Sequence, residues 1–550
     1  MQMNRTVGGF SPGFTRTRHT GIIEADIDVA RTGLALASGL LLTASFPNIG
    51  LSPLAWAGLV PLLLAVRGLS PFSGFRLGFL TGLAHYLTLA YWLGYTMNTF
   101  GGLPWALAVP IVFLLACYLA LYIAAFCAIL CAFGRKPLIA LLLIPLLWVM
   151  LEYIRSFFLT GFPWGYLGHT QYKFLQVIQI SDATGVYGVS FLIASVNAAL
   201  FMGTLAVWKK TWFGTKVRIL QATGALAGGA VLLAAAWFYG DLKLKELAVT
   251  MEKSPRAAIV AVQGNIDQAQ KWDRRLQHHI IKKYLELSLS TRPGSRALIV
   301  WPETAVPFYF NDDKRLTRMV LNGIQDAGYD FLIGSPSYTL ENGGVQYFNS
   351  AYLVLSSGTV AGKYDKAHLV PFGEYVPLKK FLPFLGKIVE HVGDFRPGEK
   401  GETLLWGKTR LGILICFEII FPELSRAAVN NGAKVLLNLT NDAWYGRTSA
   451  PYQHFSMAVF RAVENRRSLI RSANTGISAF IDPAGASHGE TDIFVPAAQA
   501  YRVPLLETRS FYTRYGDMFA LGCILLAVLA SGAGGYLNRR SLRPPPSAGT

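Results

Sequence analysis

The chain has 550 residues, of which 52% are hydrophobic and only 15% are charged, and its mean hydropathy is +0.37. Soluble domains are about a quarter charged, so this composition excludes an ordinary soluble protein and indicates that much of the chain meets lipid. The net charge of +18 lies largely beside apolar runs and comes with no nucleic-acid-binding signature, so nucleic acid is the weaker interpretation.

The chain begins with a polar segment, residues 1–30. This segment lacks the early apolar core of a cleaved signal peptide, so we expect it to be retained on the cytoplasmic side, ahead of an uncleaved signal anchor. A second cytoplasmic tail is predicted at residues 538–550.

Eight apolar runs follow one another along the rest of the chain. A helix needs about 20 apolar residues to span a bilayer. The runs lie at 32–47, 52–67, 75–97, 103–133, 137–154, 185–208, 218–240 and 517–537. The first two are short and fit either two tilted spans or one re-entrant hairpin. The sequence therefore predicts a transmembrane bundle over 31–240 and a last transmembrane helix over 517–537.

Positive charge is distributed unevenly between the connections of this bundle. The connections on one side carry Arg67, Arg76, Arg135, Lys136, Lys209, Lys210, Lys216 and Arg218, and the last span is followed by Arg539, Arg540 and Arg543. The connections 48–51 and 98–102 on the other side have no Lys or Arg. Because Lys and Arg collect on the cytoplasmic side, we expect both termini to be cytoplasmic and the domain 241–516 to face outward.

A transporter is the common alternative for a bundle of this kind. Transport pathways contain several ionisable residues within the membrane, whereas His85 and Glu152 are the clearest here. Glu152 lies three residues before Arg155, a spacing that predicts a local ion pair on one helix face. The aromatic segment 156–184 is predicted to form an interfacial layer beneath the outer domain.

From residue 256 onward, short β-branched runs alternate with amphipathic stretches. Strands are predicted at Ala257–Val262, Ala297–Trp301, Phe331–Gly334, Ala351–Leu355, Leu411–Cys416, Val435–Leu439 and Ser478–Ile481. Helices are predicted at 274–290, 314–327, 422–430 and 451–468. This alternation favours a layered α/β fold, in which reactive side chains collect at the ends of strands.

Three residues in this domain have the chemistry of an acyl-transfer site. Glu303 follows one predicted strand, Cys416 ends another, and Lys366 lies in a charged loop between them. Cys416 is the one cysteine outside the apolar runs; its strand-to-helix turn is expected to favour a thiolate. A carboxylate base and a cation for the oxyanion complete the set. Each residue alone fits an ordinary surface or core position. No Cys/His cluster indicates a metal, and no cofactor is predicted.

Several motifs together resemble a known family. Trp301-Pro302-Glu303, Tyr364-Asp365-Lys366 and Cys416-Phe417-Glu418 match the ordered Glu–Lys–Cys pattern of the nitrilase superfamily, which implies an αββα sandwich over 251–507. Its place between a multispan bundle and one last helix resembles the apolipoprotein N-acyltransferase family over about 30–540. Further matches are Lys271-Trp272, the stretch 369–377, Asn438–Tyr445, and a helix from Gln453-His454 to Arg471. Phe417 stands where many relatives have Tyr, which removes a hydroxyl.

The resemblance implies roles for these residues. Cys416 would be the nucleophile, Glu303 the base and Lys366 the oxyanion-stabilising cation. Glu374 and Glu418 would orient Lys366 or the amine, and the pocket residues would be Trp272, Asn349 and Trp444, for which core packing is the alternative. The implied reaction moves an acyl chain from a phospholipid, phosphatidylethanolamine, through a Cys thioester to the N-terminal amine of a diacylglyceryl apolipoprotein. The implied location is the cell inner membrane, with the catalytic domain on the periplasmic side.

Three further interpretations concern the lid, the acceptor and the class of protein. The apolar segment 378–395 is predicted to be a mobile lid that dips into lipid, the alternative being a loop packed on its own domain. The chemistry also fits a membrane-tethered amidase that releases its product to water. A transporter with an inactive nitrilase-like domain is the third hypothesis, and the complete Glu–Lys–Cys set argues against it.

Overall fold

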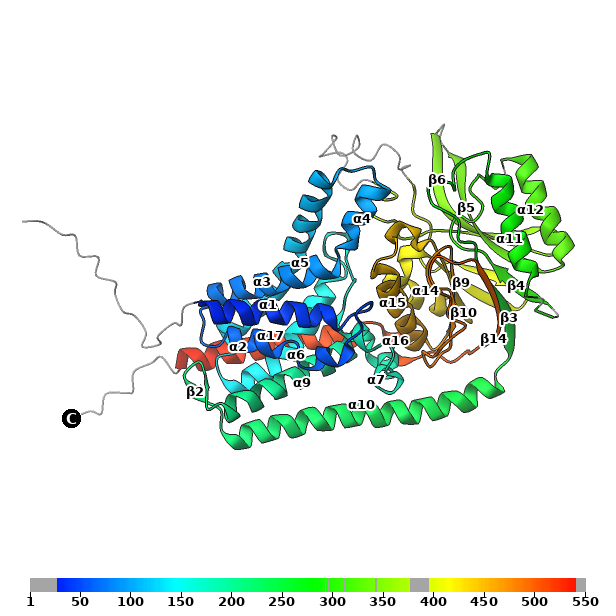
Figure 1. The fold of residues 1–550 in the computed structure, drawn as a ribbon. Coiled ribbons are helices and arrows are strands. Elements are labelled where there is room, and N and C mark those ends of the chain that lie inside the picture. Colours follow the sequence, from blue (N-terminus) through cyan, green and yellow to red (C-terminus); the bar gives the residue numbers. More distant parts are fainter. Residues whose placement is uncertain are drawn as a thin grey trace, which may run out of the picture.

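The computed structural model of the chain describes residues 27–291, 293–294, 296–310, 312–341, 344–375 and 395–540. It consists of a helical bundle and an α/β sandwich joined end to end (Figure 1). All of the predicted lid except its last residue lies outside the described residues, so that prediction is not tested.

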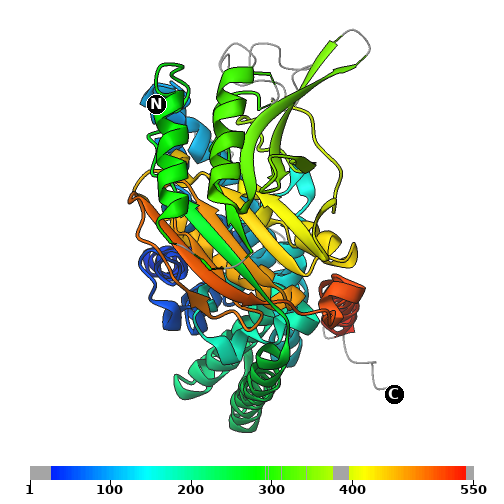
Figure 2. The same ribbon diagram turned by 90° about the vertical axis from the view of Figure 1, so that its right-hand side faces the viewer.

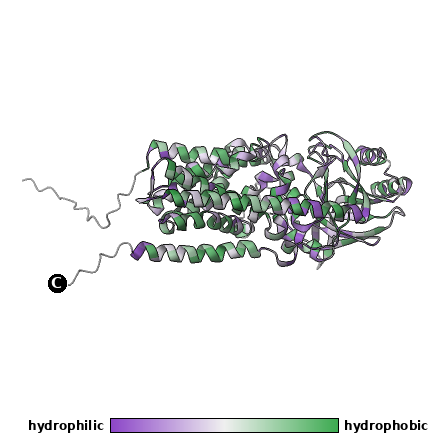
Figure 3. Cartoon of the chain, turned by 90° about the horizontal axis from the view of Figure 1, so that it is seen from below, coloured by the Kyte–Doolittle hydropathy of each residue, from purple (hydrophilic) through white to green (hydrophobic). Residues whose placement is uncertain are grey.

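Most of the bundle consists of apolar helices (Figure 3). Its helices are α1 (Val29–Ala44), η1 (Ser52–Trp56), α2 (Val60–Ala65), α3 (Pro71–Leu89), α4 (Trp92–Thr99), α5 (Trp105–Phe133), α6 (Pro137–Arg155), α9 (Val186–Val207), α10 (Ile219–Lys253) and α17 (Met518–Arg540). Among the described residues, five helices are long and apolar enough to cross a membrane, namely α5, α6, α9, α10 and α17. The chain is therefore a membrane protein. A short hairpin, β1 (Thr211–Trp212) and β2 (Thr215–Lys216), precedes α10.

The first two apolar runs form α1 and a returning segment made of η1 and α2. The returning segment packs against α1, where the Ser38 hydroxyl donates to the Gly58 carbonyl at 2.5 Å. It also packs against α9, because the Leu59 N–H donates to Asn197 Oδ1 at 2.9 Å. Further along, α10 continues past the predicted span end at residue 240 to Lys253 and lies along the molecule from bundle to sandwich (Figure 1).

Short helices form the connection between α6 and α9. They are η2 (Phe158–Thr160), η3 (Leu167–Gln171), α7 (Leu175–Ile178) and α8 (Ser181–Thr184). The predicted ion pair between Glu152 and Arg155 is wrong. Glu152 accepts from the Leu167 N–H at 2.7 Å, and Arg155 donates to the Trp164 carbonyl at 2.7 Å. Both side chains bind the main chain of this connection instead, because its buried polar groups need partners.

The sandwich contains two stacked six-stranded sheets (Figure 2). In spatial order, one sheet contains β14 (Ala497–Pro504), β3 (Arg256–Gln263), β4 (Ala297–Val300), β5 (Asp330–Glu341), β6 (Gly344–Val354) and β7 (Val360–Asp365). The other contains β13 (Ser487–His488), β12 (Ala479–Ile481), β11 (Ser468–Ala473), β10 (Val435–Thr440), β9 (Thr409–Ile415) and β8 (Thr403–Trp406). Strands β3, β4 and β5 are parallel, as are β9, β10 and β11, so each sheet has a central group of strands ending at one edge.

Helices cover both outer faces of the stacked sheets. They are α11 (Gln277–Leu289) and α12 (Lys314–Ala327) on one face, and α14 (Pro422–Asn430) and α15 (Ala450–Asn465) on the other, followed by α16 (Phe511–Tyr515). The predicted αββα sandwich is thereby confirmed. The predicted helix reaching Arg471 is wrong, because Arg466 adopts a left-handed conformation (φ +51°) that ends α15, and Arg471 lies on β11.

The α14–α15 layer joins the sandwich to the bundle. Apolar side chains of this layer belong to the same buried cluster as those of α3, α5, α6 and α9. Polar contacts also cross the boundary: Trp164 Nε1 donates to Gln453 Oε1 at 2.7 Å, and Arg466 lies 2.8 Å from Asp182. The segment 156–184, which was predicted to lie beneath the domain, therefore contributes to the surface against which the sandwich packs.

Candidate active site

Residues from the ends of three strands meet in the sandwich. Glu303 follows β4, Lys366 follows β7, and Cys416 follows β9 of the other sheet. Lys366 Nζ lies 3.7 Å from Glu303 Oε1, and its side chain is only 1% exposed. Cys416 is also buried, and its thiol lies within the electrostatic influence of both Glu303 and Lys366. The structure thus brings the three predicted residues together in one buried site.

Cys416 occupies a strained turn between β9 and the short helix η4 (Cys416–Ile420). Its φ of +53° lies in the left-handed region, which is unfavourable for a residue with a side chain. Burial, followed by the charge of Glu303, raises the pKa of the Cys416 thiol to about 12. The predicted thiolate is therefore wrong for the substrate-free site, because desolvation outweighs the nearby ammonium. Attack by this sulfur would require a base to remove its proton.

Two buried carboxylates share the Lys366 ammonium. Glu374 is the closer partner, with Oε1 and Oε2 at 3.0 and 2.9 Å from Nζ. Asn349 Nδ2 donates to Glu303 Oε1 and to Glu374 Oε1, each at 2.8 Å, and so holds the carboxylates in register. Burial opposes the charge of Lys366, but Glu374 and Glu303 together raise the pKa of its ammonium well above the usual value. Lys366 is therefore a permanent cation that can stabilise an oxyanion.

Glu418 fixes the Lys366 segment to the Cys416 turn. Its carboxylate accepts from the N–H groups of Ile415 at 2.6 Å, Ala367 at 2.6 Å and His368 at 3.0 Å, and from the Tyr364 hydroxyl. Burial raises the pKa of this carboxyl to about 7, although the backbone donors and Lys366 oppose the shift. Because its bonds reach the chain on both sides of the site, Glu418 fixes the Cys416 turn relative to Lys366.

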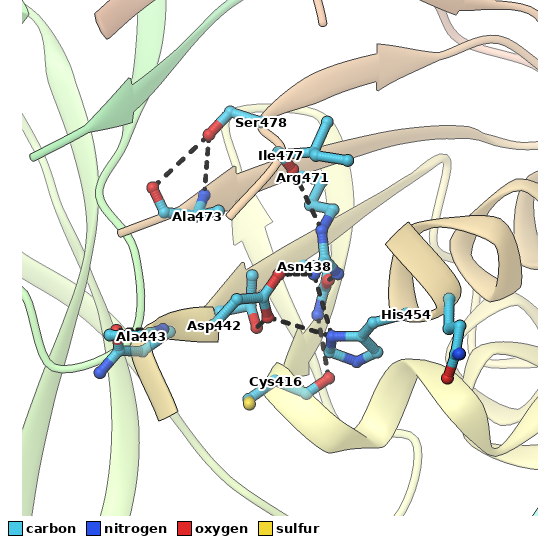
Figure 4. Close-up of polar contacts among 12 residues, drawn as sticks. Cys416, Asn438, Asp442, Ala443, His454, Arg471, Ala473, Ile477 and Ser478 are labelled. Carbon is cyan, nitrogen blue, oxygen red and sulfur yellow. Dashed lines mark hydrogen bonds and ion pairs between the residues drawn. The ribbon is translucent and has the colours of Figure 1, made fainter. Parts of the chain in front are cut away.

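A second buried polar network supports the Cys416 main chain (Figure 4). Arg471 donates to Asn438 Oδ1 at 2.5 Å and to Asp442 Oδ2 at 2.6 Å, and His454 Nδ1 lies 3.1 Å from Asp442. Asn438 donates to the carbonyl oxygens of Leu414 at 3.0 Å and Cys416 at 3.4 Å. The network holds the end of β9 through the Leu414 and Cys416 carbonyl groups, while the Cys416 sulfur points away from it (Figure 4). The sequence alone does not predict this network, because its residues lie on different elements.

The three predicted pocket residues occupy different environments. Asn349 is buried between Glu303 and Glu374, as described above. Trp272 is 53% exposed and Trp444 is 37% exposed, so neither is an ordinary core residue. The Trp444 ring contacts Phe100 of the bundle edge-on at 5.4 Å, which places it where sandwich and bundle meet. No group of acidic, His and Cys side chains within the described residues could hold a metal ion.

Comparisons with known proteins cover both parts of the chain. Residues 38–199 match the apolipoprotein N-acyltransferase N-terminal domain, and residues 256–492 match the carbon-nitrogen hydrolase domain. The apolipoprotein N-acyltransferase of Geobacter metallireducens is 47% identical over 501 residues, 90% of this chain and 94% of that one. Its counterpart from Rhizobium rhizogenes is 34% identical over 483 residues, 83% of this chain and 86% of that one. The solved structure of an amidase from Nesterenkonia sp. is 20% identical, covers 48% of this chain and 96% of its own, and aligns with a TM-score of 0.36.

Proposed function

Because the chain belongs to the apolipoprotein N-acyltransferase family, we propose that Cys416, Glu303 and Lys366 perform its reaction as nucleophile, base and oxyanion-stabilising cation. The protein is an N-acyltransferase that acts on a lipoprotein with a lipid as acyl donor. The observation that best supports this assignment is that the Cys416 thiol, the Lys366 ammonium and the Glu303 carboxyl are buried together in one site.

In the first half-reaction, the Cys416 sulfur attacks the ester carbonyl of a phospholipid while Glu303 takes the thiol proton. The carbonyl oxygen becomes an oxyanion, which Lys366 Nζ stabilises. Collapse of this intermediate breaks the ester C–O bond, and the leaving alkoxide takes the proton back from Glu303. The products are a lysophospholipid and a Cys416 thioester.

In the second half-reaction, the N-terminal amine of diacylglyceryl-cysteine attacks the thioester carbonyl. Glu303 removes the extra proton from the nitrogen and returns it to the departing sulfur, which completes the amide and restores the thiol. Glu303 Oε2 and Asn349 Oδ1 are buried and have no hydrogen-bond partner among the described residues, so both remain as acceptors for the amine. Glu374 keeps Lys366 in place throughout.

Both substrates carry acyl chains anchored in the membrane, and phosphatidylethanolamine is the donor that we propose. A catalytic domain 241–516 on the periplasmic side of the inner membrane, above a bundle at 31–240 and an anchor at 517–537, would keep their acyl chains in lipid. This avoids a transfer cost of about 0.8 kcal/mol for each CH₂ group drawn into water. The exposed rings of Trp272 and Trp444 support a role in guiding the chains to Cys416.

The test is mass spectrometry of the purified protein after incubation with phosphatidylethanolamine alone. We expect an acyl adduct on Cys416 that hydroxylamine removes, absent in Cys416→Ser and retained in Cys523→Ser, which alters a cysteine of helix α17. Addition of a diacylglyceryl lipopeptide should transfer the acyl group to its amine. Release of free fatty acid in place of the amide would favour a membrane-tethered amidase, and absence of the adduct would refute the proposed mechanism.

A further inference from the structure

Lys271 is a second buried lysine at the catalytic centre. It lies in the loop after β3, and its side chain is 1% exposed. Its Nζ donates to the main-chain carbonyl oxygen of Glu303 at 3.0 Å. The same loop is held in place near the site, because Gln268 Oε1 accepts from Asn441 Nδ2 at 2.7 Å. The mechanism above leaves this ammonium without a role.

The charges at the site do not balance without Lys271. Lys366 faces two buried carboxylates, and Glu374 engages it with both oxygens at 3.0 Å or less, whereas Glu303 lies at 3.7 Å. One cation and two anions leave a net negative charge, and an uncompensated charge in a protein interior is costly. The thiolate and the oxyanion formed during catalysis add negative charge at the same place. A second buried cation offsets one of these negative charges.

We propose that Lys271 is a positioning residue for acyl transfer, which fixes the Glu303 turn through its carbonyl and supplies the positive charge that the second carboxylate requires. This inference rests on the catalytic roles proposed above. Loss of the ammonium removes the side-chain donor that holds the Glu303 turn and favours the neutral form of Cys416, and so disfavours sulfur attack.

The site geometry also implies a characteristic pH dependence. The titratable groups that face Lys271 are the Glu303 carboxyl after β4 and the Cys416 thiol after β9. Lys366 acts on both of these groups, Asp442 acts on Cys416, and Glu374 acts on Lys366. Burial lowers the pKa of Lys271 to about 8, against the opposing charges of Glu303 and Cys416. The ammonium is therefore present below pH 8 and lost above it, and acylation should fall as pH rises through this value.

The experiment measures the rate of Cys416 acylation by phosphatidylethanolamine in the full-length protein, without acceptor. Omitting the acceptor removes the titration of its amine, which lies in the same pH range. Lys271→Met keeps the stem but removes the charge, and should slow acylation about 10- to 100-fold, as a change of one to two units in a neighbouring pKa would. Lys271→Arg keeps a charge that is not lost below pH 12.

The pH profile separates this role from a purely structural one. Wild-type protein should show an inflection near pH 8, and both Lys271 variants should lack it, with Lys271→Arg retaining the higher rate. The matched control is Lys283→Met, because Lys283 also donates to a main-chain oxygen, that of Asn265 at 3.4 Å. An unchanged rate or a persistent inflection in Lys271→Met would overturn the inference, whereas an absent adduct in wild-type protein would overturn the proposed function itself.

Discussion

Gly334 on β5 allows the turn that carries Glu303 to approach the sheet. A Cβ atom at this position would lie 2.4 Å from the Pro302 oxygen, 2.6 Å from the Thr304 nitrogen and 2.9 Å from the Glu303 Cα. All three are main-chain atoms, and ordinary contact begins at 3.4 Å. The turn is bonded to β5 at both ends, through Trp301 N–H to Leu332 and Val306 N–H to Gly334, so it cannot swing away freely. Gly334→Ala should therefore displace Glu303 by about 1 Å, which can cost about 100-fold in rate.

The assay for Gly334→Ala is the single-turnover rate of Cys416 acylation, measured together with thermal unfolding. We expect the rate to fall about 100-fold with a loss of about 1–3 kcal/mol in stability, the usual range for overpacking. The matched control is Gly362→Ala on β7, where an added Cβ meets only the end of the Leu404 side chain at 3.1 Å. A folded Gly334→Ala protein that acylates at the wild-type rate would refute the link between this glycine and the position of the base.

Two further predictions concern the Cys416 thiol and the Arg466–Asp182 ion pair between the sandwich and the bundle. Alkylation of Cys416 by iodoacetamide, followed on its tryptic peptide, should rise about tenfold for each pH unit between about 6 and 8, where Lys271 keeps its charge, because burial raises the thiol pKa to about 12 and the thiolate is the reactive form; a plateau below pH 8 would contradict this. Arg466→Ala should lower stability by about 3–5 kcal/mol, because it leaves Asp182 buried without its partner at 2.8 Å. Adding Asp182→Ala should recover part of the lost melting temperature, and a double variant less stable than the single would argue against the pair.

Most of the central strands were predictable because they are buried on both faces. Such strands contain continuous apolar runs, so β3, β4, β9 and β10 fall within one or two residues of their predicted bounds. The equally buried β11 was missed because Arg471 and Ser472 interrupt its apolar run. The β5–β6 hairpin extends well beyond its predicted strands, since its outer half is partly exposed and lacks that signal. The edge strand β14 was missed for the same reason, as most of its residues are half-buried or exposed.

The part of the site that could be predicted consists of the residues whose motifs occur in a recognisable order along the chain. Glu303, Lys366 and Cys416 follow strands that the apolar pattern marks, so their chemistry could be inferred. The Arg471–Asp442 pair joins residues 29 positions apart on different elements, and no local spacing indicates it. The ionisation of Cys416 was mispredicted because a strand-to-helix motif says nothing of how completely the fold removes water from the sulfur.

The shared apolar cluster beneath α14 and α15 has a consequence for dissecting the enzyme. A recombinant fragment containing only the sandwich would present this layer to water with the partners of Gln453 and Arg466 removed, and such a surface promotes self-association. Detergent that loosens the helices of the bundle would for the same reason disturb the α14–α15 layer, which packs against the sheet that carries Cys416. Enzymology on this chain therefore calls for lipid nanodiscs in preference to a trimmed soluble version.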